Sequence, residues 1–169
     1  IVGYTDLMQH DETSAINKLH RFKEELKLKT LQYNGEIVQY YGDGCLLTFS
    51  NTGDAVTCAK VLQEDFRVLD IQVRIGIHLG DFLIEDGNIF GDSVNISSRI
   101  EGMGVPGSVL VSDTIKQQIK NKPEFKLTSL GKFEFKNVDD AIEIFALSNY
   151  GFPVPDKMEL IGKFKALKP

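Results

Sequence analysis

The sequence has few of the residues from which metal centres and disulfide frameworks are built. Its two cysteines, Cys45 and Cys58, have no partner at metal-ligand spacing, which favours a reduced cytosolic protein. Its three histidines are scattered and form neither an HxxxH motif nor a Cys/His cluster. One of them, His78, alternates with apolar residues, so we expect it to pack or to form hydrogen bonds rather than to bind a ligand. The sequence therefore does not indicate a zinc or thiolate centre.

Long apolar runs, internal repeats and an excess of basic residues are also missing. No apolar run approaches the length of a membrane span, and we find no signal peptide. The formal net charge of -5 and the lack of a basic stripe argue against general nucleic-acid binding. A small phosphorylated ligand is not excluded, because it needs only a few local cations.

What the chain does contain is the composition of one soluble globular domain. Of its 169 residues, 42% are hydrophobic and 25% are charged, which is enough to bury a core. Glycine, proline and lysine become frequent after Ser148, so we expect a domain over residues 1–149 and a linker or C-terminal tail over residues 150–169. The chain opens on Ile1 without an initiator methionine, as a piece of a longer protein would.

The stretch Gly35–Phe49, GEIVQYYGDGCLLTF, predicts two β-strands joined by a tight turn. Apolar, aromatic and β-branched residues flank Asp43-Gly44, the pair that a type I′ turn prefers because both residues accept positive φ. A carboxylate at the tip of a stiff hairpin faces water and is held at little entropic cost, so Asp43 could bind a cation. The preference of the turn for Asp is the simpler explanation of this residue.

Two periodicities of apolar residues predict the other elements. Spacings of three and four residues, with capping residues at the ends, predict three helices: Asp11–Asn34, a helix from Asn51 or Thr52, and Val94 to about Met103. Alternation and short apolar runs predict strands over Ile71–Glu85, turning back at Gly80-Asp81, and over 109–111, 125–130, 132–136 and 142–147, with a small helix over 113–120. This order predicts an α+β fold with a mixed or antiparallel sheet and helices mainly on one face.

Asn95 and Arg99 lie four residues apart on the third expected helix, which places both side chains on one face. A guanidinium near the middle of a short helix is either a surface charge or directed at an anion, and its five donors suit phosphate oxygens. Without further information, a solvated or salt-bridged Arg99 is the simpler interpretation.

Two weaker signals lie nearer the N-terminus. Gln39 shares a strand and its parity with Asp43, but positions four residues apart in a strand are separated by about 13 Å, so these side chains cannot hold the same atom. The backbone N–H groups of the turn Gly3-Tyr4-Thr5 could cradle a phosphate at a helix N-terminus. Taken alone, an ordinary polar position and a simple turn are the better interpretations.

As a set, these features resemble the class III nucleotidyl cyclase catalytic domain, the adenylyl/guanylyl cyclase homology domain. The matching stretches occur in the right order: IVGYT at the start, YGDG in the hairpin, RIGIH in the long strand, FGDSVNISSRIE in the third helix and LGKFEFKN near the end. The resemblance covers residues 1 to about 147, and IFGDSVNISSR is its most specific part. It implies a ferredoxin-like palm sheet and a head-to-tail dimer with active sites at the interface.

The resemblance implies a metal and phosphate site near the start of the chain. Asp43 corresponds to the second of two metal-binding aspartates, and the first would directly precede Ile1, whose carbonyl would lie near the metal. The backbone of Gly3, Tyr4 and Thr5 would hold the terminal phosphates of the nucleotide. The cofactors implied are two divalent cations, Mg²⁺ or Mn²⁺, which lower the pKa of the ribose 3′-hydroxyl and neutralise the phosphates.

Three further residues correspond to the family's catalytic set. Asn95 would orient the ribose, Arg99 would stabilise charge in the transition state, and Lys136 would bind the triphosphate. Asn137 stands where a Gly often follows the lysine, a departure that concerns the shape of this loop rather than its charge.

The two positions that select the base in this family hold Gln39 and Asn88. Adenylyl cyclases typically carry Lys and Asp there, and guanylyl cyclases carry a Glu with a small residue. Both amides can donate and accept hydrogen bonds, so they could pair with either purine. The absence of the guanylyl-type Glu favours ATP over GTP.

Apart from the first metal aspartate, this chain carries both the metal residues and the Asn-Arg-Lys set, which come from opposite subunits in the family, so we expect a symmetric homodimer. The expected function is a cytoplasmic enzyme of intracellular signalling, fused to sensor or repeat domains, that converts ATP or GTP into its 3′,5′-cyclic monophosphate and pyrophosphate. The alternative is a degenerate cyclase-like domain that binds nucleotide without turnover, or only dimerises, as a regulatory module. The identity of the residue before Ile1 separates the two.

Overall fold

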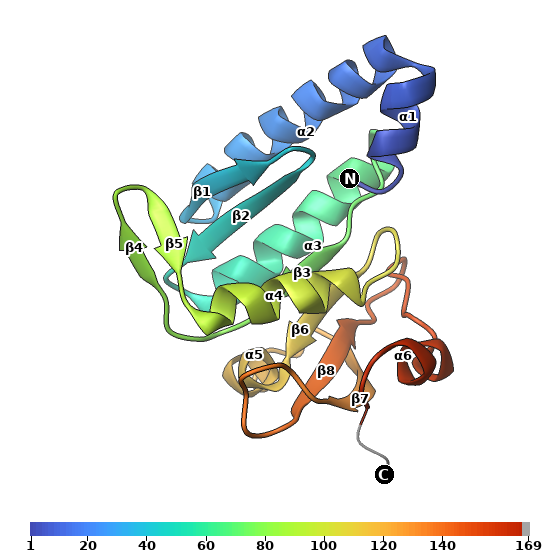
Figure 1. Cartoon of the computed structure of the whole chain (residues 1–169). Coiled ribbons are helices and arrows are strands. Elements are labelled where there is room, and N and C mark those ends of the chain that lie inside the picture. Colours follow the sequence, from blue (N-terminus) through green and yellow to red (C-terminus); the bar gives the residue numbers. More distant parts are fainter. Residues whose placement is uncertain (167–169) are drawn as a thin grey trace. The chain divides into compact units, whose positions relative to one another are not determined.

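The computed structural model describes residues 1–166, which form two compact units divided between Val73 and Arg74. Each unit combines helices with strands, so the predicted α+β class is confirmed (Figure 1). Within residues 1–166, no helix is both long enough and apolar enough to cross a membrane.

The first unit contains a β-hairpin against which two helices pack. Its elements are α1 (Tyr4–His10), α2 (Glu12–Gln32), β1 (Gly35–Tyr41), β2 (Gly44–Phe49) and α3 (Thr52–Val68). Helices α2 and α3 contact each other, and they also contact β1 and β2, respectively (Figure 1). The rings of Phe22 and Phe66 stack between the helices with their centroids 5.4 Å apart, and both side chains are buried.

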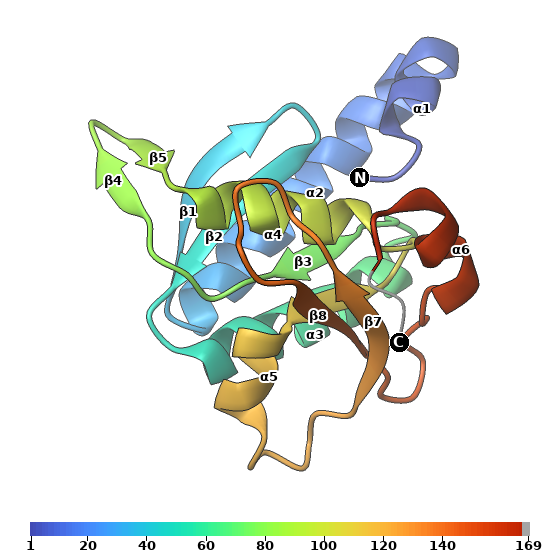
Figure 2. The same ribbon diagram turned by 60° about the horizontal axis from the view of Figure 1, so that its bottom comes forward.

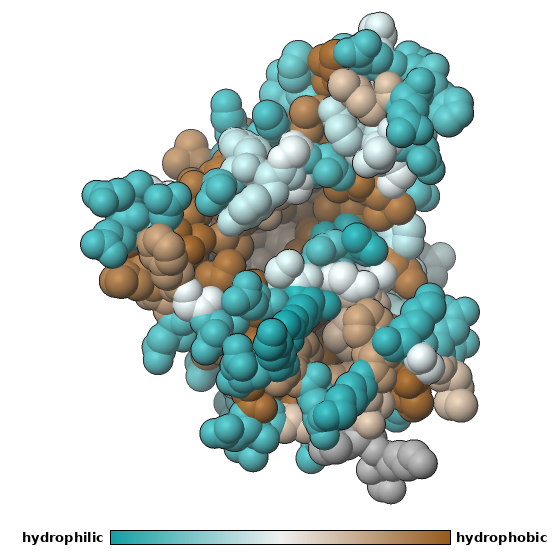
Figure 3. Space-filling model, viewed as in Figure 1, coloured by the Kyte–Doolittle hydropathy of each residue, from teal (hydrophilic) through white to brown (hydrophobic). Residues whose placement is uncertain are grey.

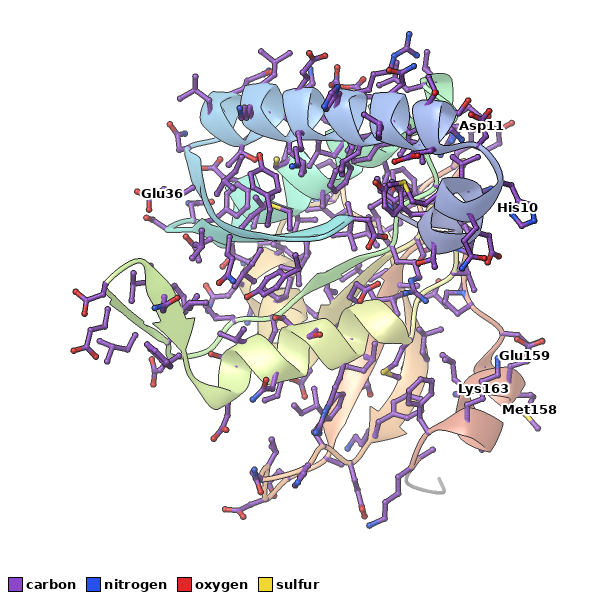
Figure 4. The ribbon with its side chains drawn as sticks, turned by 45° about the horizontal axis from the view of Figure 1, so that its top comes forward. His10, Asp11, Glu36, Met158, Glu159 and Lys163 are labelled. Carbon is purple, nitrogen blue, oxygen red and sulfur yellow. The ribbon has the colours of Figure 1, made fainter. Side chains whose placement is uncertain are left out.

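Capping residues set the helix starts in this unit. The Asp11 carboxylate accepts a hydrogen bond from the Ser14 amide at 3.1 Å, and the Asn51 side chain accepts one from the Asp54 amide at 2.9 Å. Both starts were predicted from these polar residues. The short helix α1 was not predicted. Of the expected turn Gly3-Tyr4-Thr5, only Gly3 precedes the helix, because Tyr4 and Thr5 already belong to α1. Helix α1 ends at His10, and Asp11 leads into α2 (Figure 4).

The hairpin was predicted, but its turn lies one residue earlier than expected. Tyr41 pairs with Gly44, so the two loop residues are Gly42 and Asp43 rather than Asp43 and Gly44. Gly42 takes the positive φ of 53°, and Asp43 does not have a positive φ. The sequence YGDG offers two glycines for one left-handed position, and the strand pairing selects the first.

The second unit is built on a four-stranded sheet in the order β3-β6-β8-β7. Strands β3 and β6 are parallel, and the other neighbours are antiparallel. Its elements are β3 (Ile75–Ile77), β4 (Leu83–Glu85), β5 (Asn88–Phe90), α4 (Asp92–Gly102), β6 (Val109–Ser112), α5 (Asp113–Ile119), β7 (Leu127–Phe133), β8 (Ile142–Leu147) and α6 (Lys157–Lys163). A buried cluster from α4, the sheet and α6 forms the core, with Ile100, Phe133, Ile144 and Leu160 among its members.

Two strand predictions in this unit were wrong. The alternating stretch Ile71–Glu85 is not one long strand, because only Ile75–Ile77 pairs with β6. It does not turn back on itself at Gly80-Asp81 either; β4 instead forms a separate hairpin with β5 around Asp86-Gly87, where both residues have positive φ. The strands expected over 125–130 and 132–136 are a single strand, β7, interrupted by a bulge between Ser129 and Gly131.

The segment after β8 contains helix α6. Helix α6 contacts β7 (Figure 2), and Leu160 of α6 is buried in the core of the second unit. Asp156 caps α6 by accepting a hydrogen bond from the Met158 amide at 2.8 Å. The division of the chain at residues 149 and 150 remains a prediction.

A buried carboxyl group between α2 and α3 gives a stability prediction. Glu25 lies beside Asp65, and its Oε2 atom is buried without a hydrogen-bond partner among the described residues. Burial raises the pKa of Glu25 above 4.5, the neighbouring Asp65 charge raises it further, and Lys29, paired with Asp65 at 3.3 Å, opposes the shift. Ionised Glu25 therefore destabilises the fold, and this destabilisation grows as the pH rises through the raised pKa.

We expect Glu25→Gln to increase the free energy of unfolding by about 1 kcal/mol at pH 7.5, because it removes the charge and keeps the shape. The gain should shrink as the pH falls and vanish well below pH 4.5, where Glu25 is protonated in the folded and unfolded chain alike. Urea unfolding at pH 7.5 and well below pH 4.5 measures this gain in the free energy of unfolding. Glu24→Gln on the exposed side of α2 is the matched control. An equal gain at both pH values would contradict this assignment.

Candidate functional site

In the first unit, the hairpin turn and the start of the chain meet at Asp43. The backbone nitrogen of Ile1 lies 3.0 Å from the Asp43 carbonyl oxygen and 3.2 Å from its carboxylate Oδ2. The Asp43 side chain is 38% exposed, whereas that of Ile1 is 3% exposed. The structure therefore brings together the two residues that the resemblance assigned to the metal, and it leaves the carboxylate open to solvent.

A pocket of about 330 Å³ adjoins this junction within the first unit. Gly3 and Tyr4 line it, with Gly3 at a φ of 73° where the chain enters α1. Thr5 lies in the first turn of α1 and is not part of the lining. The full lining is Ile1, Val2, Gly3, Tyr4, Leu7, Lys18, Asp70 and Gln72.

Lys18 is the one cation that lines this pocket within residues 1–166. Its ammonium donates to the Asp70 carbonyl at 3.0 Å and lies 4.0 Å from the Asp70 carboxylate. The sequence analysis missed Lys18, because nothing in the periodicity of α2 distinguishes it from the other lysines of that helix.

The donor set at Asp43 suits a hard cation but is small. Mg²⁺ prefers oxygen ligands and is commonly held by one or two carboxylates together with substrate phosphates. Asp43 supplies one such carboxylate, half-exposed and beside the Ile1 backbone. Within residues 1–166, no group of three or more His, Cys, Asp and Glu side chains is arranged to hold a metal. The residues present thus fit one carboxylate of a magnesium or manganese site.

In the second unit, helix α4 presents Asn95 and Arg99 one turn apart, and both are exposed. The neighbouring positions Ile96 and Ile100 are buried in the core, which fixes the rotation of the helix. Gly76 of β3 lets α4 approach closely, because a Cβ atom there would clash with the Glu101 amide and lie 2.7 Å from the Ser97 carbonyl. The helix face that carries Asn95 and Arg99 is therefore held rigidly.

Arg99 forms no ion pair with any described residue. In contrast, Arg74 in the same unit donates from Nε to the Glu101 carboxylate at 2.9 Å. The salt-bridged interpretation of Arg99 is thus excluded within residues 1–166. Its five donors remain available to an anion or to water.

Lys136 occupies the second position of a tight turn. The Val138 amide donates to the Phe135 carbonyl at 3.2 Å, which closes the turn, and Asn137 takes a positive φ of 65°. Asn tolerates this conformation where Gly is otherwise preferred, so Asn137 preserves the turn. Phe135 is buried and Val138 packs on the core, whereas Lys136 is exposed.

The two positions assigned to the base fall in different units. Gln39 is partly buried in β1, where it pairs with Leu46 just after a bulge at Val38. Asn88 is exposed at the start of β5, opposite Glu85. Their pairing with one purine remains a prediction.

His78 and the two cysteines have local structural roles. His78 hydrogen-bonds through Nδ1 to the Ser112 hydroxyl at 2.8 Å, as expected, and burial lowers its pKa while Asp113 opposes the shift. Both cysteines are free, and burial raises the pKa of Cys45 and of Cys58 to about 11. They stay protonated at neutral pH and are not activated nucleophiles.

Residues 54–149 match the model of a protein family described as the adenylate and guanylate cyclase catalytic domain. A Rhizobium meliloti (strain 1021) protein named "Putative adenylate cyclase 3" is 34% identical to this chain over 156 residues, which are 87% of this chain and 27% of the relative. The chain thus spans about a quarter of the length of that curated relative.

Solved structures titled as adenylate or guanylate cyclases are also similar to this chain. A Silicibacter pomeroyi structure titled adenylate/guanylate cyclase/hydrolase is 32% identical, with a TM-score of 0.78 over 85% of this chain and 90% of that one. Adenylate cyclase from Trypanosoma brucei, titled as in its monomeric state, is 17% identical and shares the fold, with a TM-score of 0.80 over 92% of this chain and 88% of that one.

Proposed function

Since the chain belongs to the adenylate and guanylate cyclase catalytic domain family, we propose that it converts ATP, and less readily GTP, into the 3′,5′-cyclic monophosphate and pyrophosphate. The chain is then a phosphorus–oxygen lyase that acts as a homodimer in the cytoplasm. The observation that carries the proposal is that Arg99, free of ion pairs within the described chain, shares one rigid helix face with Asn95.

Asp43 is the metal ligand in this proposal, and the Ile1 carbonyl would also lie near the metal. A divalent cation bound there would neutralise phosphate charge and lower the pKa of the ribose 3′-hydroxyl. Gly3, Tyr4 and Thr5 hold the terminal phosphates through their backbone, at the pocket that Gly3 and Tyr4 line. The exposure of Asp43 leaves room for phosphate oxygens to complete the coordination.

The second unit supplies the groups that act on the ribose and the phosphates. Asn95 orients the ribose so that its 3′-oxygen faces the α-phosphorus. Arg99 meets the charge that builds on the transferring phosphorus, and Lys136 meets the charge on the pyrophosphate that leaves. The rigid anchoring of α4 suits this role, because preorganised donors need not be reordered during the reaction.

Base selection falls to Gln39 and Asn88, both amides that can pair with either purine. The absence of a guanylyl-type Glu favours ATP. The kcat/KM for ATP and for GTP, measured side by side, tests this choice, and we expect the larger value for ATP. A larger kcat/KM for GTP would mean that guanine, rather than adenine, is the preferred base.

A cluster of exposed apolar residues on the β4–β5 hairpin supports the homodimer. Leu83 and Phe90 lie directly opposite each other in the hairpin and are 60% and 54% exposed. Phe82 and Ile84 are also exposed, and brown atoms gather over these strands in Figure 3. An exposed apolar patch of this kind is typical of an interaction site.

We expect the double variant Leu83→Ser/Phe90→Ser to weaken dimerisation at least about tenfold, because it removes two apolar side chains from this patch. Sedimentation equilibrium measures the dissociation constant. Met158→Ser is the matched control, since Met158 is 74% exposed on α6, away from the hairpin (Figure 4). Dimerisation that is equally strong in both variants would place the interface elsewhere.

A second candidate function follows from the small metal site. Within residues 1–166, Asp43 is not part of any group of three or more His, Cys, Asp and Glu side chains that could hold a metal. A regulatory domain that binds nucleotide without turnover would need no more than this. Asp immediately before Ile1 in the full-length protein favours the enzyme, and any other residue there favours the regulatory domain.

A further inference from the structure

Lys165 and Ala166, at the end of the described chain, contact Phe133 and Glu134, which lie just before Lys136 in the sequence. The Glu134 amide donates to the Lys165 carbonyl at 2.9 Å, and Phe133 forms an antiparallel bridge with Ala166. The Lys165 ammonium also forms an ion pair with the Glu134 carboxylate. Lys165 thus contacts Glu134 through both its backbone and its side chain.

Side chains alternate between core and solvent along this stretch. Phe133 and Phe135 are buried, whereas Glu134 and Lys136 are exposed. Strand β7 ends at Phe133 and Lys136 begins the turn, yet the Glu134 and Lys136 side chains both remain on the solvent side, because the residues before each of them are buried. Glu134 is the carboxylate nearest to Lys136 in the sequence, and it would compete for the Lys136 ammonium if it had no other partner.

We propose that Lys165 is a positioning residue for Lys136: by pairing with Glu134, it keeps the Lys136 ammonium available to the phosphates of the nucleotide. This inference rests on the role of Lys136 in the proposed function. Lys136 itself forms no ion pair with any described residue, as the inference requires. Lys165 lies outside residues 54–149, the part that matches the family model.

The C-terminal segment that carries Lys165 is anchored independently of the ion pair with Glu134. Leu160 of α6 is buried in the core, and Ala166 packs against the same cluster. Removal of the Lys165 charge should therefore leave the backbone contact to Glu134 in place. The electrostatic role can then be tested without unfolding the segment.

The test compares Lys165→Gln with Lys163→Gln, a substitution of an exposed lysine at the end of α6. We expect Lys165→Gln to raise the KM for ATP about three- to fivefold, the size that a partly exposed ion pair supports, with kcat changed less than about twofold. Lys163→Gln should change neither constant. The double variant Glu134→Gln/Lys165→Gln should restore the KM, because the competing carboxylate is gone.

Equal KM values for the Lys165 and Lys163 variants would overturn the inference. A lowered melting temperature in Lys165→Gln, with a KM that Glu134→Gln does not restore, would show a structural role only and would also overturn it. Equilibrium dialysis of ATP separates this inference from the proposed function. If the wild-type protein binds ATP but makes no cyclic nucleotide, the proposed function fails, while a weaker affinity confined to Lys165→Gln still supports the role of Lys165. Absence of ATP binding overturns both.

Discussion

We expect Arg99→Ala to lower the kcat of cyclic-nucleotide formation by about 10²–10³-fold and to change the KM for ATP by less than about threefold. The reason is that Arg99 meets charge present in the transition state and largely absent from bound ATP. Arg99 is exposed and forms no ion pair within the described residues, so its removal should leave folding intact. Initial rates over a range of ATP concentrations measure both constants.

Two further variants sharpen this test. Arg99→Lys keeps the charge but loses the planar fork of five donors, so we expect only partial activity. Arg21→Ala removes an exposed arginine from α2 and should match the wild-type protein. An unchanged kcat in Arg99→Ala would remove Arg99 from the mechanism.

The second large effect is expected at Asp43. Asp43→Asn keeps the shape of the turn but removes the charge that a divalent cation needs, so we expect kcat to fall by about 10²–10³-fold. The concentration of Mn²⁺ for half-maximal activity should rise at the same time. Metal titrations of the wild-type and variant proteins measure both effects.

Asp86→Asn is the matched control for Asp43→Asn. Asp86 also occupies a two-residue hairpin turn, between β4 and β5, and it has a positive φ of 50° that Asn tolerates. We expect this variant to retain wild-type activity and metal dependence. Equal losses in the two variants would mean that hairpin geometry, rather than the Asp43 charge, matters.

Local chemistry was sufficient to predict much of the fold. The capping side chains of Asp11 and Asn51 act within three residues of their positions, so both helix starts could be predicted from the sequence. The helix with Asn95 and Arg99 on one face was predicted for the same reason, because the spacing alone fixes it.

Features that depend on distant partners were missed. The alternation over Ile71–Glu85 is typical of a strand, but strand length is decided by the neighbour, and only Ile75–Ile77 finds one in β6. The turn in YGDG shifted by one residue because the pairing of Tyr41 with Gly44, rather than the Asp-Gly pair, sets the register.

In the candidate site too, features set by neighbouring residues could be predicted from the sequence, whereas contacts between distant residues could not. The meeting of Ile1 with Asp43 joins residues 42 positions apart, and only the family resemblance suggested it. The pairing of Lys165 with Glu134 had no counterpart in that resemblance, and no local pattern indicates it. The left-handed conformation of Asn137 could be anticipated from turn chemistry, whereas the burial of Phe135 that anchors the turn depends on the assembled core.

The most direct test of the account is the chemical identity of the product. The protein with its native upstream residues is incubated with ATP and with GTP, in Mn²⁺ and in Mg²⁺, beside Asp43→Asn. We predict a 3′,5′-cyclic nucleotide and pyrophosphate in equal amounts, formed faster from ATP and strongly reduced in the variant. Absence of a cyclic nucleotide from either substrate, in a protein shown to be dimeric, would contradict the account and favour the regulatory domain.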